Sequence, residues 1–429
     1  MAEQQNYGES KGYQVNQPLG PTVAGDNNHL TVNQYGSAPT GAERPRNEQV
    51  LLQGVRDEVD DRLSQSLHNQ VLINLGKESQ PQRVRRPWDA EVRLSRWDGG
   101  KVGEVLPEDW GIGAVFAAAK GKLLILGAPG SGKTTTLLEL ARDLLERART
   151  DVNEPLPVLV NLSSWKEDQQ SIADWLREEI RVKYGVSGKL GQQWIEEKRL
   201  LPLLDGLDEV AAERQELCVQ RINGFLASEV RPVAVVVCSR EEEYGLYQTN
   251  LELMGAICLK PLTLEQMQGY LRDLGQDNLA ESVATDGGLR ELVQAPLLLS
   301  MAVLAFGEGG LEQWRGLTTE GERLTWLLDA YVVARLQREY KGKAYAVGKV
   351  PSAGQVRRYL GWLARLMEQQ SQTEFLIEGL QPGETLESRR DKWRYRLIGG
   401  LIGGLIGGLI FGLIGGLIGG LIGGLIGGL

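Results

Sequence analysis

Residues 122–141 read KLLILGAPGSGKTTTLLELA, and this stretch decides the fold. The apolar run over 122–126 predicts a buried strand, and the leucine-rich stretch that follows Thr135 predicts a helix. Between them lies the pattern GxxxxGKT, whose glycines let the backbone turn tightly and bring N–H groups to the start of the helix, where anions bind. The stretch therefore predicts an α/β fold with a phosphate-binding loop. The residues assigned to this loop are Gly127, Gly130, Ser131, Gly132, Lys133, Thr134 and Thr135.

Two side chains of this loop carry the chemistry expected of it. Lys133 is a flexible cation that reaches terminal phosphates, and the Thr134 hydroxyl is a hard oxygen ligand for Mg²⁺. We therefore expect ATP or ADP, bound together with Mg²⁺, as the ligands of this chain.

A second apolar run, over 200–204, ends in a group of acids. Asp205 follows it directly, and Asp208 and Glu209 come shortly after. Because α/β sheets bind ligands at the carboxyl ends of their strands, we expect Asp205 to hold Mg²⁺ and the other two acids to position or polarise the attacking water. The alternative is a buried strand whose terminal acids are simply solvated, and the phosphate loop upstream favours the metal site.

Further apolar runs complete the predicted sheet. Strands are predicted over 157–162 and 232–240, and an amphipathic helix over 171–184. Continuous apolar runs are typical of strands covered on both faces, so we predict a parallel, doubly wound sheet. Arg240 then lies at the carboxyl end of a central strand, where we expect it to contact the γ-phosphate. The alternative is an ordinary surface ion pair.

The composition narrows the class of protein. The 429 residues suffice for two or three domains, and a net charge of −9 argues against direct nucleic-acid binding. Cys218, Cys238 and Cys258 show no metal-ligand spacing, so we expect reduced thiols in an intracellular protein. His29 and His68 are the only histidines, and neither belongs to a recognisable motif. Histidine-based catalysis and zinc binding are therefore not expected.

Besides the phosphate loop and the box at 205–209, the chain contains Cys238-Ser239-Arg240, Leu262-Thr263 and Ala295-Pro296-Leu297-Leu298. These motifs, in this order, resemble those of the NACHT family of signalling NTPases. The segments 161–165, 375–378 and 380–382 resemble more closely those of bacterial, especially cyanobacterial-type, members. The resemblance implies that Pro296 contacts the nucleotide, that ADP holds a closed monomer, and that exchange for ATP permits homo-oligomers to form. Hydrolysis would then be slow and would serve as a switch.

The chain departs from many members of that family in two ways. No histidine follows His68, so the winged-helix histidine that senses ADP in many relatives has no counterpart. Residues 318–390 also show no repeat array of the kind that senses a ligand in other members. The sequence therefore does not identify the trigger.

The sequence divides into six predicted segments. They are a disordered, low-complexity N-terminus over 1–46, a mostly helical adaptor over 47–117, the NACHT nucleotide-binding domain over 118–262, a helical subdomain over 263–310, a winged-helix-like domain over 311–395, and a glycine-rich transmembrane segment over 396–429. Within the first, residues 22–34 contain a Gly-Asp-Asn turn signal between short β-forming stretches. This is either a small hairpin or part of a linker.

Residues 397–429 are an uncharged repeat of Leu-Ile-Gly-Gly. A helix of this length is about 50 Å long against a hydrocarbon core of about 30 Å, so we expect one strongly tilted span or two short ones. Glycine at every fourth residue favours close helix packing, and the basic, aromatic stretch 389–396 is typical of a cytoplasmic interface. We therefore expect contact with membrane lipid, with the NTPase domain on the cytoplasmic side. The alternatives are a passive anchor and an incidental, aggregation-prone tail.

Together these features predict a nucleotide-dependent signalling switch that acts at the membrane, for which the resemblance suggests bacterial defence or stress. The rival class is a membrane-attached ATP-driven motor or remodelling enzyme, and a third is a scaffold that keeps a nucleotide for stability. A switch holds ADP tightly and turns over slowly, whereas a motor hydrolyses ATP continuously.

Overall fold

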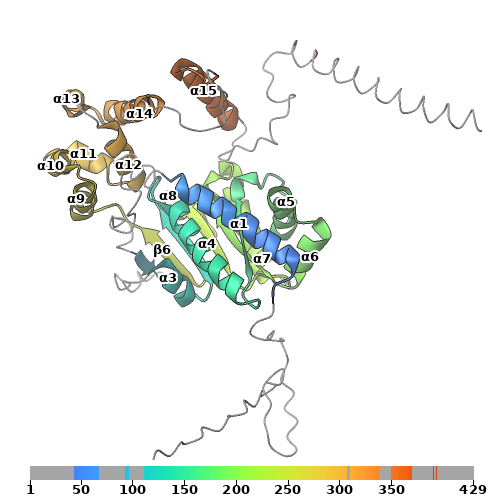
Figure 1. The fold of residues 1–429 in the computed structure, drawn as a ribbon. Coiled ribbons are helices and arrows are strands. Elements are labelled where there is room, and N and C mark those ends of the chain that lie inside the picture. The colour runs from blue at the N-terminus through green and yellow to red at the C-terminus, as the bar shows by residue number, and fades with distance from the viewer. Residues whose placement is uncertain are drawn as a thin grey trace, which may run out of the picture. The chain divides into compact units, whose positions relative to one another are not determined.

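The computed structural model describes residues 43–66, 92–95, 111–306, 310–337 and 349–369, together with residues 390 and 393. By its internal contacts the chain divides into two compact units, Met1–Lys341 and Gly342–Leu429 (Figure 1). The second unit contributes helix α15, Ala353–Gln369. All elements discussed below belong to the first unit.

A six-stranded sheet forms the centre of the first unit. Its strands are β1 Val92–Ser95, β2 Lys122–Gly127, β3 Leu156–Asn161, β4 Leu200–Asp205, β5 Val235–Arg240 and β6 Gly255–Leu259, in the spatial order β1-β6-β2-β5-β4-β3. Strands β2 to β6 are parallel, and β1 is antiparallel to β6. The prediction of a parallel α/β sheet is confirmed for these five strands.

Two details of the sheet differ from the prediction. The strand predicted over 232–240 begins only at Val235, because Pro232 cannot donate a ladder hydrogen bond and the regular pairing with β2 starts at Lys122. Strands β1 and β6 were not predicted at all. Each is short, at 4 and 5 residues, so neither carries enough periodicity to be recognised from sequence.

The helices between the strands begin and end at recognisable residues. Helix α4, Lys133–Thr150, starts at the phosphate loop, and α5, Ile172–Tyr184, is capped by Ser171 and closed by Gly185 in the left-handed conformation. The remaining helices of this region are α3 Ile112–Ala118, α6 Gly188–Glu196, α7 Ala212–Ala227 and α8 Glu241–Leu246. The predicted helix over 171–184 matches α5 within one residue.

Helix α1, Arg46–Ser64, lies beside α4 across one face of the sheet (Figure 1). Its apolar stripe is buried in the same core as strands β2 to β5; the stripe consists of Leu51, Leu52, Val55, Val59 and Leu63. The sequence predicts that this helix belongs to an adaptor over 47–117, whereas its side chains pack into the core around the sheet.

The start of α1 is held by buried charges. The Arg44 guanidinium donates to Glu48 at 2.7 Å and to the carbonyl oxygens of Asp151 and Glu154 at 2.6 Å, and Arg199 binds Glu48 at 2.9 Å. Arg44 falls within the segment predicted as disordered, over 1–46. Its exposed fraction is 6%, so the prediction of disorder is wrong at this end of the segment.

A second core is built from helices alone. Helices α9 Leu264–Asp273, α10 Asp277–Thr285, α11 Gly287–Leu292, α12 Pro296–Ala305, α13 Gly310–Arg315 and α14 Glu320–Leu336 contribute to it. Capping boxes at Thr263 and Thr319 fix the starts of α9 and α14. Trp314 and Leu327, from the region predicted as winged-helix-like, share this core with α9 to α12, and the described residues of 311–395 include no strand.

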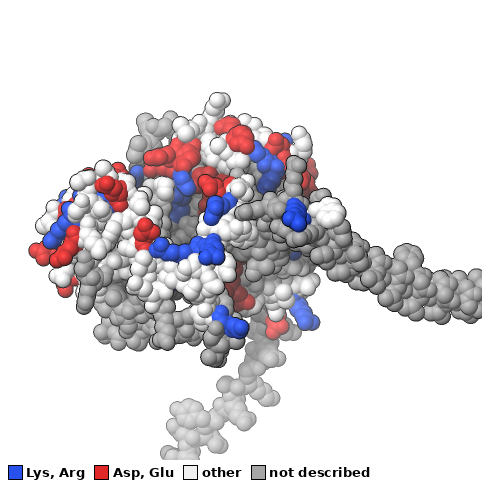
Figure 2. Space-filling view, turned by 90° about the horizontal axis from the view of Figure 1, so that it is seen from above, with Lys and Arg blue, Asp and Glu red and all other residues white. Residues whose placement is uncertain are grey.

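Among the described residues no helix is both long and apolar enough to cross a membrane. The segment 397–429 and the turn motif at 22–34 lie outside the described residues, and both stay predictions. On the face seen in Figure 2, acidic and basic side chains are interspersed over the described surface.

Candidate nucleotide-binding site

The loop between β2 and α4 depends on its glycines. Gly130 and Gly132 have φ values of +71° and +97°, in the left-handed region that favours glycine. A Cβ atom on Gly127 would lie 2.5 Å from the Ser131 hydroxyl oxygen. The loop therefore adopts a tight turn that side chains at these three glycine positions would strain or block.

Lys133, the first residue of α4, turns back across this loop. Its ammonium group donates to the carbonyl oxygens of Gly127 at 2.8 Å and Ala128 at 3.1 Å. Burial lowers the pKa of Lys133, and the negative charge of Asp208 opposes that shift. A partly desolvated ammonium at a helix start is well placed to bind phosphate oxygens.

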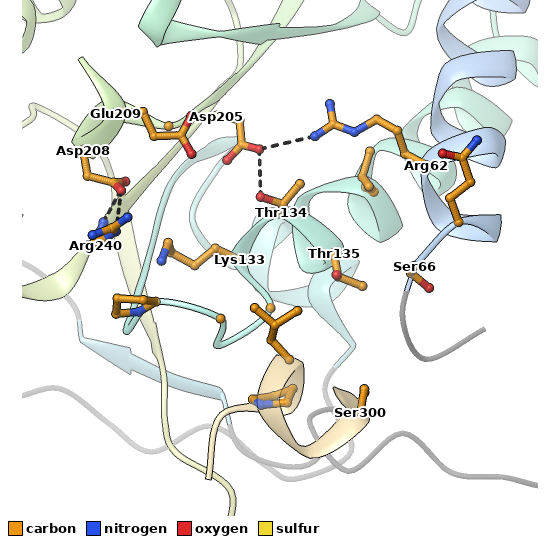
Figure 3. Close-up of a pocket in the computed structure, with 18 residues that line it drawn as sticks. Arg62, Ser66, Lys133, Thr134, Thr135, Asp205, Asp208, Glu209, Arg240 and Ser300 are labelled. Atoms are coloured by element: carbon orange, nitrogen blue, oxygen red, sulfur yellow. Dashed lines mark hydrogen bonds and ion pairs between the residues drawn. The ribbon is translucent and has the colours of Figure 1, made fainter. Parts of the chain in front are cut away.

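The predicted metal ligands lie next to one another. The Thr134 hydroxyl donates to Oδ2 of Asp205 at 2.9 Å (Figure 3). One hydroxyl and one carboxylate are hard oxygen donors, and Mg²⁺ commonly takes one or two carboxylates plus substrate phosphates as ligands. This pair therefore fits Mg²⁺ delivered with a nucleotide. A cluster of three or more His, Cys, Asp or Glu ligands is not found among the described residues.

Asp208 and Arg240 form an ion pair at the edge of the site. Nε of Arg240 lies 2.8 Å from Oδ2 of Asp208, and the Arg240 backbone N–H donates to Oδ1 at 3.0 Å. The strand register pairs Arg240 with Gly127, which brings it beside the phosphate loop. Burial raises the pKa of the Asp208 carboxyl, although Lys133 and Arg240 oppose the shift. A carboxylate with a raised pKa is a better general base near neutral pH.

Glu209 is oriented by a residue that the sequence analysis did not assign to the site. The Asn161 side-chain amide donates to Oε2 of Glu209 at 2.9 Å, and the register places Asn161 beside Asp205. Gly206 has φ +72°, and a Cβ there would lie 2.5 Å from the same Glu209 oxygen. Asn161 could have been assigned to the site from the sequence, because it lies near the carboxyl end of a predicted strand.

These groups surround one cavity of about 620 Å³ (Figure 3). The predicted residues that line it are Gly130, Gly132, Lys133, Thr134, Thr135, Asp205, Asp208, Glu209, Arg240 and Pro296. Gly127 and Ser131 belong to the loop but do not line the cavity. The lining residues that the prediction missed include Arg62, Gln65 and Ser66 at the end of α1, and Ser300 on α12.

Helix α12 joins the second core to the phosphate loop. The Leu297 backbone N–H donates to the Gly130 carbonyl oxygen at 3.2 Å, and a Cβ on Gly130 would lie 3.0 Å from Cβ of Leu297. Pro296 and Ser300 line the cavity from the same helix. The ligand site is therefore shared between the sheet domain and the helical core.

A strand, a glycine loop and a helix, with a threonine of that helix hydrogen-bonded to an aspartate at the end of β4, define the P-loop NTPase class. Residues 122–278 match the model of the NACHT domain family, and this part of the chain is a NACHT domain. The match covers less than half of the 429 residues.

Two further comparisons add little to this assignment. A solved structure of the Aeropyrum pernix ORC1 protein in complex with DNA is similar over 66% of this chain and 75% of that chain. The two chains are 19% identical, with a TM-score of 0.31. No curated protein matches the sequence.

Proposed function

We propose that this protein is a nucleotide-dependent switch that binds ATP or ADP with Mg²⁺, hydrolyses ATP slowly and forms homo-oligomers in the ATP state. The observation that carries the proposal is the shared cavity. It joins the phosphate loop and the acidic box to α12, which belongs to the second, helical core. Loss of the terminal phosphate from a nucleotide bound beside Gly130 would therefore alter the hydrogen bond between Gly130 and Leu297. Because Leu297 belongs to α12, the change would reach the helical core.

Different residues of the site would bind the nucleotide and catalyse its hydrolysis. The glycine loop and Lys133 bind the phosphates, while Thr134 and Asp205 hold the metal ion. Mg²⁺, when bound, neutralises phosphate charge. Glu209, oriented by Asn161, and Asp208 position the attacking water and accept its proton. Arg240 lines the same cavity and pairs with Asp208. It would contact the γ-phosphate and lose that contact after hydrolysis.

We also propose, from the sequence, that the protein acts at a membrane and takes part in bacterial signalling. The Leu-Ile-Gly-Gly repeat of 397–429 and its basic border support a membrane-associated output with the NTPase domain on the cytoplasmic side. The resemblance to bacterial NACHT proteins supports a role in defence or stress signalling. The trigger is left unassigned.

The decisive experiment measures nucleotide content and mass together. Detergent-purified full-length protein is expected to contain tightly held ADP, to be monomeric by light scattering, and to turn over slowly. Lys133→Ala should purify without nucleotide, because a loop ligand for phosphate is lost. The double variant Asp208→Asn, Glu209→Gln should slow hydrolysis by roughly two to four orders of magnitude and accumulate as ATP-bound oligomer.

Other outcomes decide between the classes. Fast, continuous hydrolysis by nucleotide-free wild-type protein would support the motor instead. A double variant that holds ATP yet stays monomeric would contradict nucleotide-gated assembly. Wild-type affinity for ATP in Lys133→Ala would refute the site itself.

A further inference from the structure

The last turn of α1 forms one wall of the nucleotide cavity. Arg62, Gln65 and Ser66 line it, and all three lie outside the matched domain at 122–278. In Figure 3 the Arg62 side chain extends from α1 toward Asp205, on the side of the site opposite to Arg240. A helix far upstream of the phosphate loop therefore places a cation in the site.

The Arg62 guanidinium approaches the carboxylate oxygen that is expected to bind metal. Nη2 of Arg62 lies 3.9 Å from Oδ2 of Asp205, and the same oxygen accepts the Thr134 hydrogen bond at 2.9 Å. The exposed fractions of these two side chains are 29% for Arg62 and 10% for Asp205. At this burial the attraction between the two charges is screened less than it is on an open surface.

A network around Glu58 holds Arg62 in this place. Oε1 of Glu58 lies 3.3 Å from Nη1 of Arg62 and 2.7 Å from Nζ of Lys183, and the Tyr184 hydroxyl donates to Oε2 at 2.7 Å. The neighbouring Val59 and Leu63 are buried in the core. These contacts hold the end of α1 in place and the guanidinium beside Asp205.

We propose that Arg62 is a nucleotide-binding residue that neutralises Asp205 when no metal is bound and competes with Mg²⁺ for that carboxylate. Without a counter-ion the Asp205 carboxylate repels the phosphates of a metal-free nucleotide. Arg62 removes this repulsion and supplies donors for phosphate oxygens. When Mg²⁺ is present the two cations share one carboxylate, so Arg62 weakens the response to the metal. This inference rests on the proposed nucleotide site.

The test compares binding of a fluorescent ADP analogue to the full-length protein in EDTA and in saturating Mg²⁺. Arg62→Gln should raise the Kd in EDTA about tenfold or more, because a charge-assisted contact is lost. The Kd in Mg²⁺ should rise much less. The Mg²⁺ concentration that gives half of the metal-dependent binding should fall, because the competing cation is gone. Arg62→Lys keeps the charge and should lie between the two proteins in EDTA.

Arg56→Gln is the matched control. Arg56 lies on the same helix and pairs with Glu146 and Asp60, and it does not line the cavity. This variant should bind the analogue as the wild type does in both buffers. Thermal unfolding of each variant reports separately on stability.

The outcomes separate this inference from the proposed function. An Arg62→Gln protein that matches Arg56→Gln in EDTA would overturn it, and so would an equal loss of affinity in both buffers. If Arg62→Gln does not fold, an Arg62→Lys Kd that is raised in EDTA more than in Mg²⁺ supports the role of Arg62, and a Kd that is unchanged in EDTA or raised equally in both buffers refutes it. Failure of the wild type to bind in either buffer refutes the nucleotide site itself.

Discussion

Single glycines decide whether the acidic side chains reach the cavity. Gly206 follows Asp205 directly and has φ +72°, so the chain turns sharply enough for Glu209 to fold back beside Asn161. A left-handed backbone costs a residue with a side chain about 1–2 kcal/mol. The cost is compounded here because the missing Cβ faces a carboxylate oxygen.

We therefore predict that Gly206→Ala lowers the free energy of unfolding by at least about 1–2 kcal/mol and slows ATP hydrolysis, since Glu209 must move. Denaturant titration and a phosphate-release assay measure the two effects. Gly224→Ala is the control, because Gly224 lies inside α7 with no atom within 4 Å of an added Cβ. That variant should gain about 0.5–1 kcal/mol. Equal stability of the two alanine variants would contradict the argument.

At the scale of elements, α1 is the helix whose role the sequence did not reveal. Its periodic apolar residues predicted a helix correctly, but periodicity does not say which surface the stripe covers. In the structure the apolar stripe of α1 packs against α4 and β3. Arg62, in the last turn of α1, lines the cavity. Helix α1 therefore belongs to the core of the sheet domain.

Two substitutions on adjacent residues of α1 test this assignment. Leu51 is 1% exposed and Val50 is 59% exposed. Leu51→Ala should lower the free energy of unfolding of the nucleotide-binding domain by about 2–5 kcal/mol, whereas Val50→Ala should change it by less than about 0.5 kcal/mol. Chemical denaturation with a probe in the sheet domain measures both. Similar small losses for the two variants would show that α1 is not part of this core.

At the scale of the whole molecule, the chain combines a P-loop sheet domain, a helical core that touches the phosphate loop, and a glycine-striped tail. The first two line one cavity, so we expect a nucleotide bound there to stabilise the contact between them. The role of the tail stays a prediction from its repeat, whose glycines permit close contact between helices.

The tail is tested by replacing four glycine pairs with leucine, at 403–404, 407–408, 415–416 and 419–420. The variant stays hydrophobic enough for membrane insertion but loses the flat packing surface. Membrane localisation should survive, and any ion leakage caused by the hydrolysis-deficient double variant should disappear. Fractionation and a dye-leakage assay measure the two effects. Leakage that persists would refute glycine packing, and wild-type protein found wholly in the soluble fraction would refute membrane association.

Local chemistry could be predicted from the amino-acid sequence. The phosphate loop with Thr134, and the acids Asp205 and Asp208 after an apolar run, were each predicted from a short motif. The carboxyl ends of parallel strands meet at one edge of a sheet, so the two motifs were expected to form one site. The long apolar strands were also predicted from short stretches of sequence, whereas β1 and β6 are too short to carry a pattern.

Only the tertiary structure decided which distant residues complete the site. Arg62 reaches Asp205 because α1 packs against α4, and Asn161 reaches Glu209 because β3 lies beside β4 in register. Ser300 lines the cavity because α12 begins at the phosphate loop. Helices and strands are placed mainly by burial of apolar surface, which sums over many contacts and has no preferred direction. A short stretch of sequence therefore does not show which distant element it will contact.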